Sequence, residues 1–299
     1  MALKKQLLPI LNANKETLET TIDATGIQIW KAQELKRFLR AQDSINFIFS
    51  STSLTADDLI KYLTEYSYLQ KIKFKTPRIE NLFLWRSVSK FAIFPALRPD
   101  GYYTHQTALH IHGLGQLLDV IYFNHEQPIR PTSGVLEQSR IDNAFSKGQR
   151  LTSARTNYDG IEYWLLNGKQ TGRYGVTTMK TNDNLEVPVT DLERTLVDIT
   201  VRPAYAGGVN NVLMAYRLAQ PKLSIQKLAD TIRALKYVYP YHQSIGFYID
   251  AAGVYDEQDS RLFLNFGPFQ YDFYLDYKMI NPHYSEKWKL YYSTSFTSL

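Results

Sequence analysis

The sequence predicts an α+β fold in two domains, residues 1–95 and 96–299. Segments with helical and strand periodicity follow one another without the regular alternation of a doubly wound sheet. The formal charge is also unequal: residues 1–95 hold 14 Lys and Arg against 9 Asp and Glu, whereas residues 96–299 hold 20 of each kind. Pro95, Pro99 and Gly101 interrupt the pattern and place the domain boundary near residue 96.

Two helices are expected in the first domain. Between residues 28 and 41 the apolar positions recur at helical spacing, which predicts a helix that also carries Lys31, Lys36, Arg37 and Arg40. A β-like stretch at 45–49 and a run of hydroxyl residues at 50–53 follow it. A second helix is expected from Thr55, which can cap it, because Asp57 and Asp58 lie where the helix dipole favours negative charge.

Lysines alternate with apolar residues directly after this second helix. Successive side chains of a strand point to opposite faces, so Lys71, Lys73 and Lys75 are expected on one face and Ile72 and Phe74 on the other. A turn at 76–78 and a return strand at 82–85 complete a basic hairpin. Two helices followed by such a hairpin predict a winged helix-turn-helix with an N-terminal arm. A solvent-facing edge strand protected by its charge is the structural alternative.

The net positive charge of the first domain is typical of a nucleic-acid-binding domain. The acidic start of the second helix would repel phosphates, so the wing and the hydroxyl run are better candidates for contact. The wing candidates are Lys71, Lys73, Lys75, Arg78 and Arg86. The first helix would add Lys31, Lys36, Arg37 and Arg40. The candidates nearest the bases are Thr52, Ser53 and Lys61.

The second domain is expected to mix helices and strands. Helices are predicted at 104–113, 135–145, 208–219, 223–237 and 241–252, and another carries residues 192–199. Strands are predicted at 120–123, 163–166 and 174–177. The aromatic tail from 261 to 292 is β-like, with a turn at 265–268.

Five segments of this domain resemble the AbiEi-type antitoxin family: residues 102–114, 120–124, 193–198, the turn at 202–208 and residues 239–253. The similarity covers roughly residues 30–255. It implies a winged helix-turn-helix that binds double-stranded operator DNA and represses its own toxin–antitoxin operon. It also implies that residues 96–299 counter a nucleotidyltransferase toxin in phage defence. Some relatives lack a toxin gene, so a stand-alone regulator is the alternative. The family carries no catalytic residues, and the resemblance implies neither enzymatic activity nor a cofactor.

The signature residues of the resemblance are Glu193, Arg194, Asp198, Arg202, Gly207 and Gly208. Their chemistry fits a structural role. Asp191 or Thr190 can cap a helix, and Arg194 and Asp198, four residues apart, can pair on one helical face for a few tenths of a kcal/mol. The two glycines supply positive φ or close backbone approach. A direct partner contact by Glu193 or Arg194 is the functional alternative.

The sequence patterns for a catalytic or metal site are weaker than those for DNA binding. The sequence has no cysteine, which excludes disulfides, thiolate metal sites and a cysteine nucleophile. His110 and His112 would point about 200° apart on a helix, so neither they nor His105 predict a metal site. A weak enzymatic alternative is a metal-dependent nuclease that uses Asp250, Asp276 and Lys278.

The sequence also gives expectations about location. No run of 18 apolar residues is present, so no membrane span or membrane partner is expected. The basic start of the chain is cut short by Pro9 and a polar stretch, which is not the pattern of a signal peptide. A cytoplasmic location is therefore expected.

Overall fold

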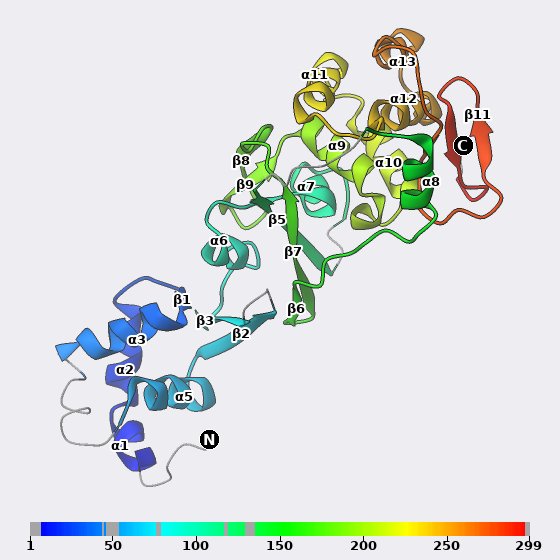
Figure 1. Cartoon of the computed structure of the whole chain (residues 1–299). Helices are drawn as coiled ribbons and strands as arrows, with labels where there is room; N and C mark the ends of the chain where they lie inside the picture. The colour runs from blue at the N-terminus through cyan, green and yellow to red at the C-terminus, as the bar shows by residue number, and fades with distance from the viewer. Residues whose placement is uncertain are drawn as a thin grey trace. The chain divides into compact units, whose positions relative to one another are not determined.

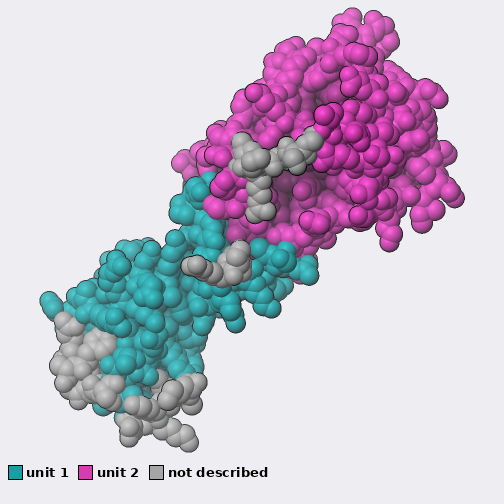
Figure 2. Space-filling view, viewed as in Figure 1, with its two compact units in different colours: residues 1–100, 153–158 teal, residues 101–152, 159–299 magenta. Residues whose placement is uncertain are grey.

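The computed structural model describes residues 7–43, 45, 54–75, 79–116, 119–128 and 135–296. Its helices and sheets are mixed, which confirms the α+β class (Figure 1). The chain divides into two compact units (Figure 2). Unit 1 consists of residues 1–100 and 153–158, and unit 2 of residues 101–152 and 159–299. Three of the predicted DNA contacts, Thr52, Ser53 and Arg78, lie outside the described residues.

Unit 1 combines helices with a three-stranded antiparallel sheet. Its helices are α1 (Leu8–Ala13), α2 (Lys15–Asp23), α3 (Ala32–Ala41), α5 (Ala56–Tyr66) and α6 (Ile93–Leu97). Its sheet has the order β1-β3-β2, formed by β1 (Ile29–Lys31), β3 (Ile79–Trp85) and β2 (Leu69–Lys75). In this sheet Ile72 lies opposite Leu82, which fixes the register of the β2–β3 hairpin.

The first predicted helix begins later than its periodicity indicated. Residues 29–31 form β1, where Trp30 is buried and pairs with Phe83 of β3. Helix α3 then begins at Ala32, and the Glu34 carboxylate accepts from the Lys31 N–H at 3.1 Å. Trp30 contacts Phe38 of α3, with 4.9 Å between ring centroids. The helical spacing of apolar residues therefore extends from α3 back into β1, which explains why the helix was predicted to begin too early.

Helices α2, α3 and α5 bury their apolar faces together in the core of unit 1, through Leu18, Ile22, Leu35, Leu39, Leu59 and Leu63. Helix α5 begins at the predicted cap. The Asp58 N–H donates to Thr55 Oγ1 at 3.3 Å, and the Thr55 N–H donates to the Asp58 carboxylate at 2.9 Å. Helices α1 and α2 were not predicted. Tyr62 of α5 donates its hydroxyl to Asn12 Oδ1 of α1 at 2.7 Å.

One segment distant in sequence also belongs to unit 1. Strand β6 (Arg155–Tyr158) contacts β2, where Thr156 Oγ1 donates to the Lys73 carbonyl at 2.8 Å. The Tyr158 hydroxyl donates to Gln70 Oε1 of the same strand. The β2 side of the hairpin is therefore accompanied by residues 153–158, an arrangement that no sequence pattern predicted.

Unit 2 contains most of a six-stranded mixed sheet. Its strands run in the order β7-β5-β4-β9-β8. They are β7 (Ile161–Lys169), β5 (Val120–Gln127), β4 (Tyr102–Tyr103), β9 (Glu186–Thr190) and β8 (Val176–Lys180). Strands β5 and β7 are parallel, as are β4 and β9, while β4–β5 and β8–β9 are antiparallel.

The helices of unit 2 surround α9 (Leu192–Val201), whose residues are all buried. Helix α9 contacts α7 (His105–Ile111), α10 (Val209–Ala219), α11 (Ile225–Leu235) and α12 (Tyr241–Ala252) (Figure 1). The remaining helices are α8 (Gln138–Phe145), α13 (Glu257–Leu264) and the 3₁₀ turn η2 (Pro203–Ala206). In the part of the chain that the structure describes, no helix combines the length and apolarity required to traverse a bilayer.

The aromatic tail is only partly β-structured. It begins with the end of α13, and its strands β10 (Phe273–Tyr274), β12 (Leu290–Tyr292) and β11 (His283–Ser285) are short and form a small sheet in that order. Its aromatic residues instead pack into the helical core. Phe273, for example, is fully buried and lies 5.0 Å from the Phe145 ring of α8.

Candidate functional site

The exposed face of β2 carries the predicted wing lysines. Lys71, Lys73 and Lys75 are exposed, whereas Ile72 and Phe74 are 2% and 1% exposed, as the alternation predicts. No carboxylate among the described residues forms an ion pair with any of these three lysines. Three ammonium groups thus project from one face of one strand, where they can contact an anionic partner.

The nearest acidic residue of the hairpin is engaged elsewhere. Glu80 of β3 lies opposite Phe74 in the register, and its carboxylate accepts from the Arg98 guanidinium, with one bond of 2.8 Å. Arg98 therefore compensates the Glu80 charge, and the face of β2 keeps its positive charge.

Helix α3 provides a second group of basic side chains. Arg37 and Arg40 are exposed, and together with Gln33 and Lys36 they line a shallow surface groove. Lys36 Nζ lies 2.6 Å from the carboxylate of Asp57 at the start of α5. This pair reduces the phosphate repulsion expected from Asp57. Lys31 lies one residue before α3, at its N-cap.

Helix α5 itself exposes a predominantly acidic face. Asp57, Thr64 and Glu65 are exposed there, and Lys61 lies 4.0 Å from Glu65. An exposed pair at this spacing stabilises a helix only slightly. The exposed surface of α5 therefore offers little positive charge.

Arg86 is engaged in a partly exposed ion pair with Asp23. It donates from Nε and Nη2 to the Asp23 carboxylate at 2.8 and 2.7 Å, and its guanidinium lies 4.2 Å from the Tyr68 ring centroid. Trp85 Nε1 donates to the same carboxylate at 2.7 Å. The hydrogen bonds from Arg86 and Trp85 lower the pKa of Asp23 to about 2. Arg86 thereby joins the end of β3 to α2.

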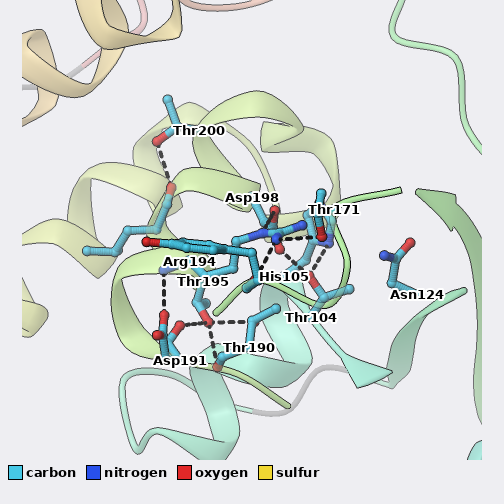
Figure 3. Close-up of polar contacts among 12 residues, drawn as sticks. Thr104, His105, Asn124, Thr171, Thr190, Asp191, Arg194, Thr195, Asp198 and Thr200 are labelled. Atoms are coloured by element: carbon cyan, nitrogen blue, oxygen red, sulfur yellow. Dashed lines mark hydrogen bonds and ion pairs between the residues drawn. The ribbon is translucent and has the colours of Figure 1, made fainter. Parts of the chain in front are cut away.

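In unit 2, two of the signature residues, Arg194 and Asp198, belong to a buried polar network around α9 (Figure 3). Arg194 Nε donates to Asp198 Oδ1 at 2.8 Å, and the two side chains are only 4% and 7% exposed. Thr104 Oγ1 donates to the other carboxylate oxygen at 2.8 Å, and Arg194 Nη1 donates to the Tyr174 carbonyl at 2.8 Å. The predicted pairing of Arg194 with Asp198 is confirmed. Because the pair is buried, loss of one partner costs more stability than it would at a surface pair.

The cap of α9 and its neighbour Glu193 join two helices. Asp191 Oδ1 accepts from the Arg194 N–H at 2.8 Å, which identifies Asp191 as the cap. Lys227 Nζ of α11 contacts Asp191 Oδ2 at 2.9 Å and Glu193 Oε2 at 2.8 Å. Burial opposes ionisation of Glu193, but Lys227 and the Ser224 N–H outweigh it and hold the pKa of Glu193 below its ordinary value.

The turn after α9 requires its two glycines. Gly207 has φ 81° and Gly208 has φ 100°, as expected for positive-φ positions. A Cβ at Gly207 would also lie 2.3 Å from Asn211 Nδ2. Arg202, which ends α9, is exposed and donates from Nη1 to the Arg150 carbonyl at 3.1 Å.

Sequence reasoning missed the part of the network on β5. Glu126 accepts from the Thr171 and Gly172 N–H groups at 2.9 and 3.1 Å and from the Tyr102 hydroxyl at 3.0 Å. Asn124 Nδ2 donates to Tyr102 Oη at 2.7 Å. The only available signal was the appearance of polar residues at the end of an apolar strand, which does not identify their partners.

The two carboxylates of the nuclease alternative make hydrogen bonds or ion pairs with other residues. The Asp250 carboxylate accepts from Trp288 Nε1 at 2.7 Å and pairs with Lys287 at 2.6 Å, and Asp276 Oδ1 accepts from the Tyr277 N–H at 2.8 Å. Within the described ranges, no hydrogen bond or ion pair joins Asp250, Asp276 and Lys278, and no group of His, Asp and Glu has the arrangement of a metal site.

No model of a protein family matches the chain, and no curated protein matches it. Among solved structures, the chain is similar to the crystal structure of the RV2827C protein from Mycobacterium tuberculosis, with a TM-score of 0.58 and 11% sequence identity. The similarity covers 92% of this chain and 89% of that chain. At this identity the likeness concerns the fold.

Proposed function

We propose that the protein is a DNA-binding transcriptional repressor of the antitoxin type and that unit 1 is its winged helix-turn-helix. The order of elements supports this proposal, because α2, β1, α3 and α5 precede a hairpin whose second strand pairs with β1. Helices α3 and α5 form the helix-turn-helix pair, and β2 and β3 form the wing. The observation that carries the proposal is the row of exposed lysines on β2.

The charge distribution indicates how such a unit contacts a duplex. Lys71, Lys73 and Lys75 bind phosphates along one strand of DNA, and Arg37 and Arg40 of α3 add further phosphate contacts. Helix α5 enters the major groove with a mainly acidic surface, so affinity comes chiefly from the wing and from α3. Lys36 supports α5 in this role by neutralising Asp57.

The role of unit 2 rests on its resemblance to AbiEi-type antitoxins. We propose that unit 2 counters a nucleotidyltransferase toxin encoded in the same operon. The signature residues Glu193, Arg194 and Asp198 are buried and joined to one another or to neighbouring helices. They therefore maintain the shape of the unit, and a toxin would be recognised through other, exposed residues.

The DNA-binding proposal is tested by the salt dependence of operator affinity. Gel shifts with a duplex from upstream of the gene are compared for wild type and a variant with Lys71, Lys73 and Lys75 changed to Gln. Each lost phosphate contact lowers the slope of log affinity against log salt by about 0.9, so the variant binds more weakly with a slope shallower by about 2.7.

A matched control removes three exposed lysines of unit 2: Lys180, Lys222 and Lys278. Its net charge equals that of the wing variant, and we expect its affinity and salt slope to remain close to those of the wild type. Equal effects of the two triple variants would contradict the wing assignment, because they would reflect net charge alone.

A further inference from the structure

Unit 2 contains a cavity of about 280 Å³ beside the buried network of α9. It is lined from β5, β7, α9 and the segment before β6, and its residues include Thr104, His105, Arg150, Lys169, Arg202 and Tyr205. Arg150 and Arg202 also line an adjoining hollow together with Arg140 and Lys147. The cavity therefore opens beside a strongly basic surface of the same unit.

The cavity has an excess of positive charge. Its lining contains four cationic side chains, Arg150, Lys169, Arg194 and Arg202, and a single carboxylate, Asp198. Asp198 already compensates Arg194. Lys169 Nζ is held by the carbonyls of Leu235 and Lys236 at 2.9 and 2.7 Å.

Arg150 is the cation whose charge is least compensated. It is exposed at the rim of the cavity, and its guanidinium makes no hydrogen bond or ion pair with the residues that the structure describes. Arg202 lies beside it and donates to the Arg150 carbonyl at 3.1 Å. Both residues line the cavity, and guanidinium groups are suited to binding a phosphate.

His105 lines the same cavity, and its ring carries an unsatisfied hydrogen-bond acceptor. Its side chain is 93% buried, and its Nε2 has no partner among the described residues. The hydroxyl proton of Thr104 is used in the bond to Asp198, so His105 Nδ1 is the donor in its 3.0 Å contact with Thr104 Oγ1 (Figure 3).

The protonation state of His105 follows from its surroundings. Burial lowers the pKa of His105 to about 4, which leaves the ring neutral at pH 7. With its proton on Nδ1, the ring presents an unshared electron pair at Nε2. A buried acceptor without a donor is costly, so this atom indicates a missing partner that carries an O–H or N–H group. The backbone of His105 also has φ 53°, a conformation that residues other than glycine rarely adopt.

The remaining walls of the cavity are aromatic and apolar. Tyr205 packs edge-on against His105, with 5.3 Å between ring centroids, and Tyr237, Leu166 and Val201 complete this side. A ligand that fits all three features carries a phosphate, a planar ring and a hydrogen-bond donor. The volume of the cavity suits a single small molecule better than a polymer.

We propose that this cavity binds a nucleoside monophosphate. The phosphate lies between Arg150 and Arg202, a hydroxyl or amino group donates to His105 Nε2, and the base packs against Tyr205. This inference is independent of the DNA-binding proposal, because it concerns unit 2 alone and predicts binding in the absence of DNA.

Isothermal titration calorimetry of the full chain tests the site with the four ribonucleoside 5′-monophosphates, the matching nucleosides and inorganic phosphate. We expect at least one monophosphate to bind roughly tenfold or more tightly than both its nucleoside and phosphate alone, because only it makes both sets of contacts. If no monophosphate binds more tightly than inorganic phosphate, the proposal is overturned.

Three variants locate the binding. Arg150→Gln changes an exposed side chain and should weaken monophosphate binding roughly tenfold, as expected for a charge-assisted contact. Arg261→Gln, which removes an exposed arginine of α13, is the matched control and should leave binding unchanged. His105→Phe keeps the ring beside Tyr205 and should abolish the preference for the monophosphate over phosphate. Equal binding by the Arg150 and Arg261 variants would overturn the assignment, whether or not the His105 variant folds.

Discussion

Arg194 and Asp198 form an ion pair of 2.8 Å within a helix whose ten residues are all buried. Both partners make further hydrogen bonds, to Tyr174 and Thr104 respectively. Such a pair contributes little net stability when intact, because desolvation offsets attraction, but its disruption leaves an uncompensated charge in the protein interior.

We therefore expect Asp198→Asn to destabilise the protein by about 3–5 kcal/mol, because Arg194 would remain buried without its counter-charge. Urea unfolding followed by circular dichroism measures this loss. The matched control is Asp230→Asn, whose exposed pair with Arg233 has a length of 3.1 Å and is expected to contribute about 0–1 kcal/mol. Similar losses for both variants would contradict the energetic role assigned to burial.

The Asp23 carboxyl should titrate at an unusually low pH. Its folded pKa is about 2, below its ordinary value of 3.8, so the interaction stabilises the fold above about pH 4 and is lost as the pH falls towards 2. In Arg86→Gln, the pKa should move back towards 3.8. NMR titration of the Asp23 side chain measures both values, and an unchanged pKa in the variant would show that Arg86 does not hold this carboxylate.

His242 should make the stability of the protein depend on pH at less acidic values than Asp23 does. Its ring stacks on Phe266 at 5.1 Å, and burial lowers its pKa to about 4. The unfolded chain binds a proton near pH 6.5 that the folded chain excludes, so stability falls as the pH drops from 6.5 to 4. Each unit of pKa difference corresponds to about 1.4 kcal/mol. In His242→Phe this decline should be smaller, as measured by thermal unfolding across that range.

Gly246 of α12 should not tolerate even one methyl group. A Cβ at this position would lie 2.1 Å from the Trp288 indole, which is itself 1% exposed and cannot move aside freely. We expect Gly246→Ala to cost about 1–3 kcal/mol through overpacking, despite the better helix propensity of alanine. Gly148→Ala, where no heavy atom lies within 4 Å, is the control and should be close to neutral in the same melting experiment.

The parts of the fold that the sequence predicted correctly are those governed by local rules. The alternation of residues 71–75, the cap at Thr55 and the positive φ at Gly207 and Gly208 each depend on neighbours in sequence. The end of α7 near Gly113, which has φ 73°, follows the same logic.

The features that escaped prediction depend on partners far apart in sequence. The strand at Trp30 exists because β3 pairs with it, although its apolar spacing matched a helix. The pairing of Glu80 with Arg98, of Arg86 with Asp23 and of Asp198 with Thr104 could not be read from spacing. For the same reason, the lysines of β2 were identified as exposed, but the unsatisfied nitrogen of His105 was not.

The return of residues 153–158 to β2 has a practical consequence for dissecting the protein. A fragment cut after residue 100 would lack the Thr156 hydroxyl that donates to the Lys73 carbonyl, and would leave that carbonyl of the edge strand β2 open to a second molecule. Such unprotected edges promote self-association. Experiments on the operator should therefore use the intact polypeptide, since an isolated head could oligomerise for reasons unrelated to its biology.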